Sequence, residues 1–113
     1  MKKNLFEIYP FTDTTIEQFD ILLGGDDLSL PGSFRLERIL SFGQTTPEGE
    51  WYDQAWSEWV AVLRGMAILA YDDGATVTLR PGDHLVIKPG VRHRVSYTSD
   101  DCYWLAFHFN DPK

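Results

Sequence analysis

Several residue types are scarce in this chain of 113 residues, and each scarcity excludes a class of protein. The single cysteine, Cys102, excludes an internal disulfide framework and a zinc site built from several thiolates. Lysine and arginine number 10 against 17 aspartates and glutamates, which gives a formal net charge of −7. Nucleic acids, anionic membrane surfaces and heparin-like polymers bind to basic surfaces, so we expect none of them as a partner.

Long hydrophobic runs are absent as well. No segment approaches the ~20 apolar residues of a membrane-spanning helix, and the basic start of the chain leads into no signal-peptide-like hydrophobic stretch. With no export signal and a lone cysteine, we expect a cytoplasmic protein. The chain does contain 43% hydrophobic and 14% aromatic residues, enough to pack one compact domain and too many for a disordered chain.

The sequence divides into an N-terminal extension over residues 1–32 and a β-rich domain over residues 33–113. In the extension, the segment from Thr14 to Glu17 matches a capping box, and the following apolar residues recur at helical spacing as far as Gly24. We therefore expect at most one short helix or turn here, packed on the domain that follows.

Strand signals dominate the second part of the chain. Residues 34–38 and 76–79 alternate between apolar and polar side chains, and residues 59–63 form a short apolar run. The Asp73-Gly74 pair is typical of a tight hairpin turn, and Pro-Gly pairs separate the later segments. The pattern predicts seven or eight short strands in an all-β sandwich or barrel.

Two blocks of spaced residues carry most of the functional information. In the first block, Glu58 is followed after six residues by Gly65. In the second, Gly82 precedes a Pro-Gly turn that ends at Gly90, and His93 follows after two residues. Glu58 opens an apolar strand, and if its face points into a barrel, the carboxylate needs a cation or strong hydrogen-bond donors.

These blocks resemble the two motifs of the cupin family. The first cupin motif is a glycine, five residues, His-x-His, three or four residues, a glutamate, six residues and a glycine, and Gly49 lies near the expected first glycine. The second is a glycine, five residues, Pro-x-Gly, two residues and a histidine. Here Lys88 replaces the proline and Pro89 follows it. The resemblance implies a small single-domain cupin, an all-β barrel of the double-stranded β-helix (jelly-roll) type, that forms a homodimer.

The resemblance also implies that Glu58 and His93 hold a divalent metal ion at the mouth of the barrel. A carboxylate and an imidazole together suit hard to borderline cations. Gln54 offers a neutral amide oxygen and is the third ligand that we predict. A small-molecule ligand is expected in the same place, together with the metal or without it.

The His-x-His pair of the first motif is replaced in this chain, and two alignments of that pair remain open. Three intervening residues before Glu58 put Tyr52 and Gln54 at the histidine positions, whereas four put Trp51 and Asp53 there. Tyr52 and Asp53 are the candidates for a catalytic proton donor or acceptor.

Three other polar residues have weaker sequence signals. We expect His84 to pack within the structure or at an interface rather than to bind a ligand. His108 shares a face of the last strand with Trp104, which would bring it to the pocket wall. Arg38 is a candidate partner for an inner carboxylate.

Two functions from different classes remain open. The first is a metal-dependent enzyme acting on a small polar or aromatic molecule, in which the ion is a Lewis acid or an oxygen-activating centre. The second is a metal-free, non-catalytic ligand-binding or regulatory barrel, which the loss of the His-x-His pair favours. A barrel of this type hosts many activities, so the fold does not choose between the two.

Overall fold

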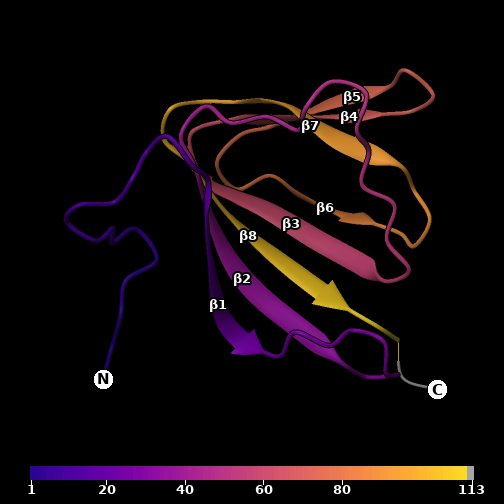
Figure 1. Cartoon of the computed structure of the whole chain (residues 1–113), viewed down its shortest axis with the longest axis horizontal. Coiled ribbons are helices and arrows are strands. Elements are labelled where there is room, and N and C mark those ends of the chain that lie inside the picture. The colour runs from indigo at the N-terminus through magenta and orange to yellow at the C-terminus, as the bar shows by residue number, and fades with distance from the viewer. Residues whose placement is uncertain (112–113) are drawn as a thin grey trace.

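The computed structural model describes residues 1–111, which contain eight β-strands and no helix (Figure 1). In chain order the strands are β1 (Gln18–Gly24), β2 (Phe34–Ser41), β3 (Ser57–Arg64), β4 (Ala67–Tyr71), β5 (Thr76–Leu79), β6 (His84–Ile87), β7 (His93–Thr98) and β8 (Cys102–Phe109). The predicted all-β architecture, with seven or eight short strands, is confirmed. No helix capable of crossing a membrane occurs in residues 1–111.

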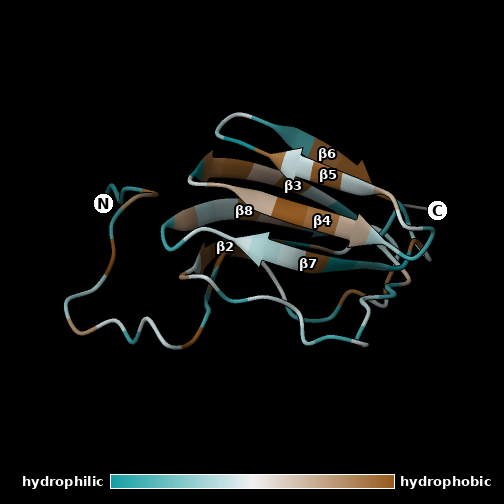
Figure 2. Ribbon diagram, turned by 90° about the horizontal axis from the view of Figure 1, so that it is seen from above, coloured by the Kyte–Doolittle hydropathy of each residue, from teal (hydrophilic) through white to brown (hydrophobic). Residues whose placement is uncertain are grey.

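The strands form two antiparallel sheets. The larger sheet has five strands in the order β1-β2-β8-β3-β6, and the smaller has three in the order β5-β4-β7. Figure 2 shows the two sheets stacked, with β4 and β7 over β3 and β8. Buried side chains from both sheets meet in one core, among them Val60 and Trp104 from the larger sheet and Leu69 from the smaller. The core therefore lies between the sheets, where alternate residues of each strand point inward.

The capping-box pattern left a short helix or a turn open for this segment, and the structure has a turn at residues 14–15 and no helix. Residues 18–24 form β1, which pairs with β2 from Gln18 opposite Leu40 to Gly24 opposite Arg35. An isolated short helix is only marginally stable in water, whereas the free edge of β2 offers a ladder of backbone donors and acceptors. β1 belongs to the five-stranded sheet. The sheet therefore begins earlier in the chain than residue 33, the point at which the strand pattern of the sequence begins.

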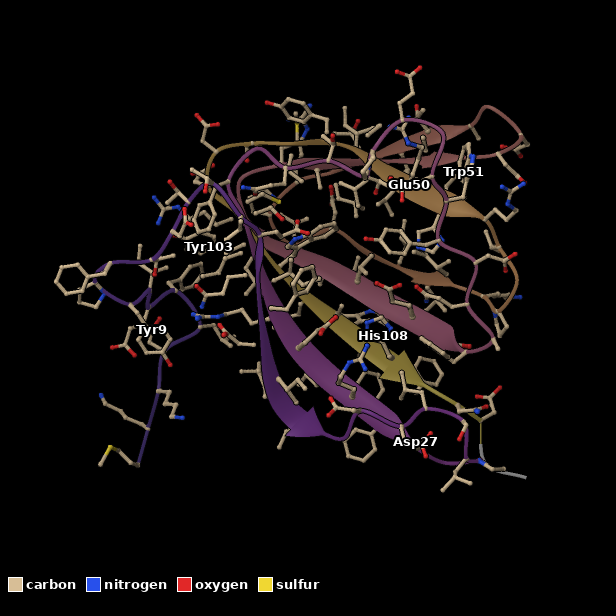
Figure 3. All side chains as sticks on the ribbon, in the orientation of Figure 1. Tyr9, Asp27, Glu50, Trp51, Tyr103 and His108 are labelled. Atoms are coloured by element: carbon tan, nitrogen blue, oxygen red, sulfur yellow. The ribbon has the colours of Figure 1, made fainter. Side chains whose placement is uncertain are left out.

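Arg38 fastens the segment that precedes β1. Its guanidinium donates to the carbonyl oxygens of Leu5, at 3.0 Å, and Glu7, and to Asp20 Oδ2 at 3.0 and 2.6 Å. Phe6 packs against Tyr103, with ring centroids 6.4 Å apart. Figures 1 and 2 show the segment before β1 extending away from the sheets, and Figure 3 shows Tyr103 at its base. Arg38 thus pairs with Asp20 on β1 and not with a carboxylate of the pocket described below.

Gly65 occupies the turn between β3 and β4 with φ of +75°, a conformation that glycine adopts readily. A Cβ at this position would lie 2.4 Å from Ser99 Oγ and 2.8 Å from the backbone oxygen of Asp101. We predict that Gly65→Ala lowers the free energy of unfolding by more than about 1 kcal/mol in a urea titration.

Gly82→Ala is the matched control for this prediction. Gly82 has a similar φ of +91°, but a Cβ there would meet no atom within 4 Å. Its alanine variant therefore carries the backbone strain without the clash and should lose less stability than Gly65→Ala. Equal losses for the two variants would show that the close approach to Ser99 and Asp101 is unimportant.

Candidate functional site

A cavity of about 90 Å³ opens between the two sheets. Its lining combines an apolar floor with a polar end, and it comprises Glu17, Phe19, Glu37, Ile39, Tyr52, Gln54, Glu58, Val60, Leu69, Ile87, His93, Val95, Trp104 and His108. Side chains alternate between the two faces of a strand, so residues two apart point to the same face. Glu58 and Val60 therefore line the pocket together, and so do His93 and Val95.

His93 is held by its own backbone and by one nitrogen of its imidazole. It opens β7, as the Pro-Gly turn before it suggests, and its backbone exchanges two hydrogen bonds with Tyr52, of 2.8 and 3.1 Å. The ring Nδ1 lies 2.9 Å from the carbonyl oxygen of Val91. A carbonyl only accepts, so Nδ1 carries a proton, and in the neutral imidazole Nε2 then has the lone pair. The Tyr52 ring stacks on the imidazole at a centroid distance of 5.6 Å.

Glu58 lies close to Nε2 of His93. Its Oε1 lies 3.8 Å from His93 Nε2, beyond hydrogen-bond distance, and the two side chains are 11% and 4% exposed. Gln54 Nε2 donates to the same Oε1 at 3.1 Å. The structure therefore brings together Glu58, His93 and Gln54, the three residues predicted as metal ligands.

His108 lies on β8 opposite Glu58 of β3. It forms a second pair in the pocket, with Glu37. The indole N–H of Trp56 donates to His108 Nδ1 at 3.0 Å, so Nε2 carries the proton and donates to Glu37 Oε1 at 3.0 Å. Glu37 Oε2 lies 3.6 Å from Arg35 Nε. Both nitrogens of His108 are thus engaged by the protein. Figure 3 shows His108 on β8, over the larger sheet.

Sequence reasoning placed His108 near the pocket wall but missed Glu37. The signal for Glu37 is its alternation with Ile39, a buried core residue, which puts the glutamate on the inner face of β2. Glu17 was missed too, because nothing local distinguishes it from a helix-capping glutamate. In the structure its Oε2 accepts a hydrogen bond from the Ser41 hydroxyl, whose oxygen in turn accepts from Trp104 Nε1 at 3.1 Å.

The environment shifts the pKa values of two residues of the pocket. Burial raises the pKa of Glu17 above its usual 4.5, with a smaller contribution from the charge of Glu37, and the hydrogen bond from Ser41 opposes the rise. Burial also raises the pKa of Tyr52 above 10, with help from Glu17 and Glu58. Tyr52 therefore keeps its proton at neutral pH and is a hydrogen-bond donor rather than a base or a phenolate ligand.

We predict that Glu17→Gln raises the midpoint of thermal unfolding by a few degrees at pH 7. Because the pKa of Glu17 is higher in the folded than in the unfolded state, its ionisation costs stability as the pH rises above the unfolded value. The gain should disappear below about pH 4, where the carboxyl is protonated in both states. Calorimetry at the two pH values checks this, and a lower midpoint for the variant at pH 7 would contradict it.

The structure distinguishes the two alignments of the missing His-x-His pair. Tyr52 and Gln54 line the pocket, whereas Trp51 and Asp53 do not. Asp53 is exposed. The guanidinium of Arg92 lies over the ring of Trp51, 5.5 Å from the ring centroid. Figure 3 shows Trp51 beside the smaller sheet, away from His108. Asp53 is therefore not brought to the site as a proton donor or acceptor.

His84 lies outside the pocket, on the exposed side of β6. Its Nδ1 accepts a hydrogen bond from the indole of Trp59 at 3.2 Å, and the two rings are 5.7 Å apart. This packing against a neighbouring aromatic ring agrees with the expectation that His84 is not a pocket ligand.

The donor set does not fit a resident divalent metal ion. Glu58 and His93 supply two donor atoms, whereas Gln54 turns its amide N–H toward Glu58 and Tyr52 holds its proton. Catalytic zinc sites in proteins typically have about three protein ligands. Within residues 1–111, no three histidine, cysteine, aspartate or glutamate side chains converge closely enough to hold a metal ion.

The fold and the pocket define a small all-β barrel with a polar site between its sheets. The model of the cupin domain matches residues 40–108, and the chain belongs to the cupin family. No curated protein matches the chain at a significant level.

Solved structures resemble this chain over most of its length. One, a "putative mannose-6-phosphate isomerase" from Ralstonia eutropha JMP134, is 35% identical with a TM-score of 0.82, and the match covers 97% of this chain and 98% of that one. Another, an RmlC-like cupin protein from Desulfovibrio desulfuricans, is 19% identical with a TM-score of 0.70, over 96% and 94% of the two chains. The second similarity shows the fold alone.

A metal-containing structure is also among the neighbours. The structure of Fe(II) HppE is 14% identical with a TM-score of 0.58, over 67% of this chain and 42% of that one. Cupin folds similar to this one thus include a protein that holds iron, but the likeness concerns the fold and not the ligands of this chain.

Proposed function

We propose that this cupin binds a small polar organic molecule in the pocket between its sheets, through Glu58 and His93 and without a resident metal. One observation carries the proposal: His93 lines the pocket, and its Nε2 has no hydrogen-bond partner among the described residues. A polar atom that faces a pocket without a protein partner is free to bind a ligand or water. A ligand with an N–H or O–H group would satisfy this nitrogen.

Binding fits the site better than turnover. His93 Nε2 and the Glu58 carboxylate are both proton acceptors, so a proton could be removed from a substrate. Stabilising the negative charge that then develops requires a cation or a set of aimed donors. The lining residues of the described chain include no lysine or arginine.

A phosphorylated sugar, suggested by the name of the Ralstonia relative, is a poor match for this pocket. Proteins bind phosphate through arginine, lysine or helix N-termini. The lining contains three glutamates, Glu17, Glu37 and Glu58, and residues 1–111 contain no helix. A phosphate dianion would be repelled here, so we do not extend that activity to this chain.

Calorimetric titration of tag-free protein tests the proposal with three four-carbon probes, namely 1,4-diaminobutane, 1,4-butanediol and succinate. Binding of any one of them should weaken at least roughly tenfold in Glu58→Gln and His93→Ala. Asp26→Asn, which removes one charge from an exposed turn, is the control and should bind like the parent. If none of the probes binds, the proposal is wrong.

Elemental analysis of the same preparations tests the metal-dependent alternative. We expect less than one equivalent of any divalent metal, because two donor atoms hold an ion weakly. Stoichiometric metal that disappears in both Glu58→Gln and His93→Ala would contradict the metal-free proposal and support the metal-dependent enzyme predicted from the resemblance.

We also propose, from the family resemblance, that the protein is a cytoplasmic homodimer. The edge strand β1 supports this, since Ile21 and Leu23 are 50% and 61% exposed and an apolar edge strand invites pairing with another chain. Size-exclusion chromatography with light scattering should give twice the chain mass of 13.0 kDa. A mass of one chain at micromolar concentration would contradict the dimer.

A further inference from the structure

We infer that the ligand of this pocket is a small organic cation, an amine whose N–H groups reach more than one of the pocket glutamates. The inference rests on the proposed function and names the chemical class of the molecule that the site takes. Charge, hydrogen-bonding capacity and the spacing of the carboxylates point independently to an amine.

The charge of the pocket is the first part of the argument. Glu37 has Arg35 at 3.6 Å and the N–H of His108 at 3.0 Å. Glu17 and Glu58, in contrast, have no lysine or arginine within ion-pair distance in the described residues, and a neutral His93, whose Nε2 lies 3.8 Å from Glu58 Oε1, adds no positive charge. Two partly or largely buried carboxylates without a cation are costly, and a cationic ligand would offset that cost.

The hydrogen-bonding capacity of the pocket also favours an amine as the ligand. Each glutamate uses one oxygen to accept from a neutral protein donor, which is Ser41 for Glu17, His108 for Glu37 and Gln54 for Glu58. The second oxygen of each has no hydrogen bond in the described structure. His93 Nε2 is a further acceptor to which no described residue donates. The His93 side chain is 4% exposed. An ammonium group offers three donors and no acceptor, which complements such a site.

The distance between the uncompensated carboxylates favours an extended molecule over an atomic ion. Glu17 directly precedes β1 and Glu58 lies on β3, and β2 and β8 separate these strands in the sheet. Three strand spacings amount to roughly 14 Å at the backbone. Within residues 1–111 no three potential ligands converge on one point. A short chain with nitrogen at both ends would meet both carboxylates, whereas one metal ion would not.

The walls of the pocket suit the carbon skeleton of such a molecule. Phe19, Tyr52 and Trp104 line the cavity, and the faces of aromatic rings attract organic cations. Leu69 and Ile87 provide an apolar floor against which methylene groups would pack. A pocket that joins carboxylates, aromatic rings and aliphatic side chains is complementary to an aliphatic amine.

The test compares 1,4-diaminobutane with 1,4-butanediol and succinate, which have the same four-carbon chain and differ in charge. We expect the diamine to bind at least roughly tenfold more tightly than the diol and succinate not to bind. The diamine affinity should fall as sodium chloride is added. Glu58→Gln and Glu17→Gln should each weaken the diamine by roughly tenfold, whereas Asp26→Asn should not.

The outcomes separate the two proposals. Tighter binding of the diol or succinate, with loss in Glu58→Gln, would overturn the cationic ligand and leave the small-molecule function in place. Binding of the diamine that is insensitive to both Glu17→Gln and Glu58→Gln would place it elsewhere on this acidic protein and overturn the inference. Binding of none of the probes would overturn both.

Discussion

Replacing His108 with leucine is expected to lower the free energy of unfolding by about 3 kcal/mol. The substitution removes the N–H that pairs with Glu37 and the nitrogen that accepts from Trp56. Glu37 is 8% exposed, so its carboxylate would be left buried beside Arg35 alone, whose Nε lies 3.6 Å away. Removing the donor leaves a buried carboxylate oxygen without its hydrogen bond, and an unsatisfied charged group costs more than the bond contributes.

Three further variants make the His108 prediction specific. His108→Gln retains a donor and an acceptor in one side chain and should lose less stability than the leucine variant. Adding Glu37→Gln to His108→Leu removes the buried charge and should recover part of the loss. His84→Leu, at an exposed histidine that also bonds a tryptophan, should change stability by less than about 0.5 kcal/mol. If urea unfolding shows equal losses for His84→Leu and His108→Leu, the buried network contributes nothing.

Replacing Arg38 with methionine is expected to release the segment before β1 and to lower the free energy of unfolding by about 2 kcal/mol. The Arg38 side chain is 8% exposed, and its guanidinium joins two backbone carbonyls of that segment to Asp20 of β1. Charge-assisted bonds of this kind are roughly twice as strong as neutral ones. Methionine keeps the apolar stem and loses every donor, so amide hydrogen exchange should accelerate in residues 5–7 and in β1.

Arg64→Met is the matched control for the Arg38 prediction. Arg64 also pairs with an aspartate, Asp101 at 3.3 Å, but both side chains are more than half exposed. Exposed pairs contribute about 0–1 kcal/mol, so this variant should unfold close to the parent. Unchanged hydrogen exchange in residues 5–7 of Arg38→Met would show that Arg38 does not fasten the segment.

Most of the barrel could be predicted from the sequence because strand alternation and turn residues are local signals. The Pro-Gly turn before His93 correctly indicated that the histidine opens a strand, and Glu58 lies on the inner face with Val60 as the alternation predicts. β1 could not be predicted in the same way. The capping pattern at Thr14 favoured a helix, and only the unpaired edge of β2, which is distant in sequence, makes the strand the better solution.

The site was predicted in part for related reasons. Gln54 and Asp53 are neighbours in a loop, and spacing alone does not determine which of two adjacent residues points inward. Glu37 had a usable signal in its alternation with Ile39, but its charge made an outward position the simpler interpretation. Glu17 reaches the pocket only through the pairing of β1, so an incorrect secondary structure concealed it.

The most direct test of the small-molecule site is the measurement of intermolecular nuclear Overhauser effects between protein ring protons and 1,4-diaminobutane. The structure predicts contacts from the methylene protons of the ligand to the rings of His93, Tyr52 and Trp104, which line the cavity. It predicts none to His84 and Trp59, which pack together outside the cavity. Contacts at His84 and Trp59 with none at His93 would contradict the assignment of the pocket as the binding site.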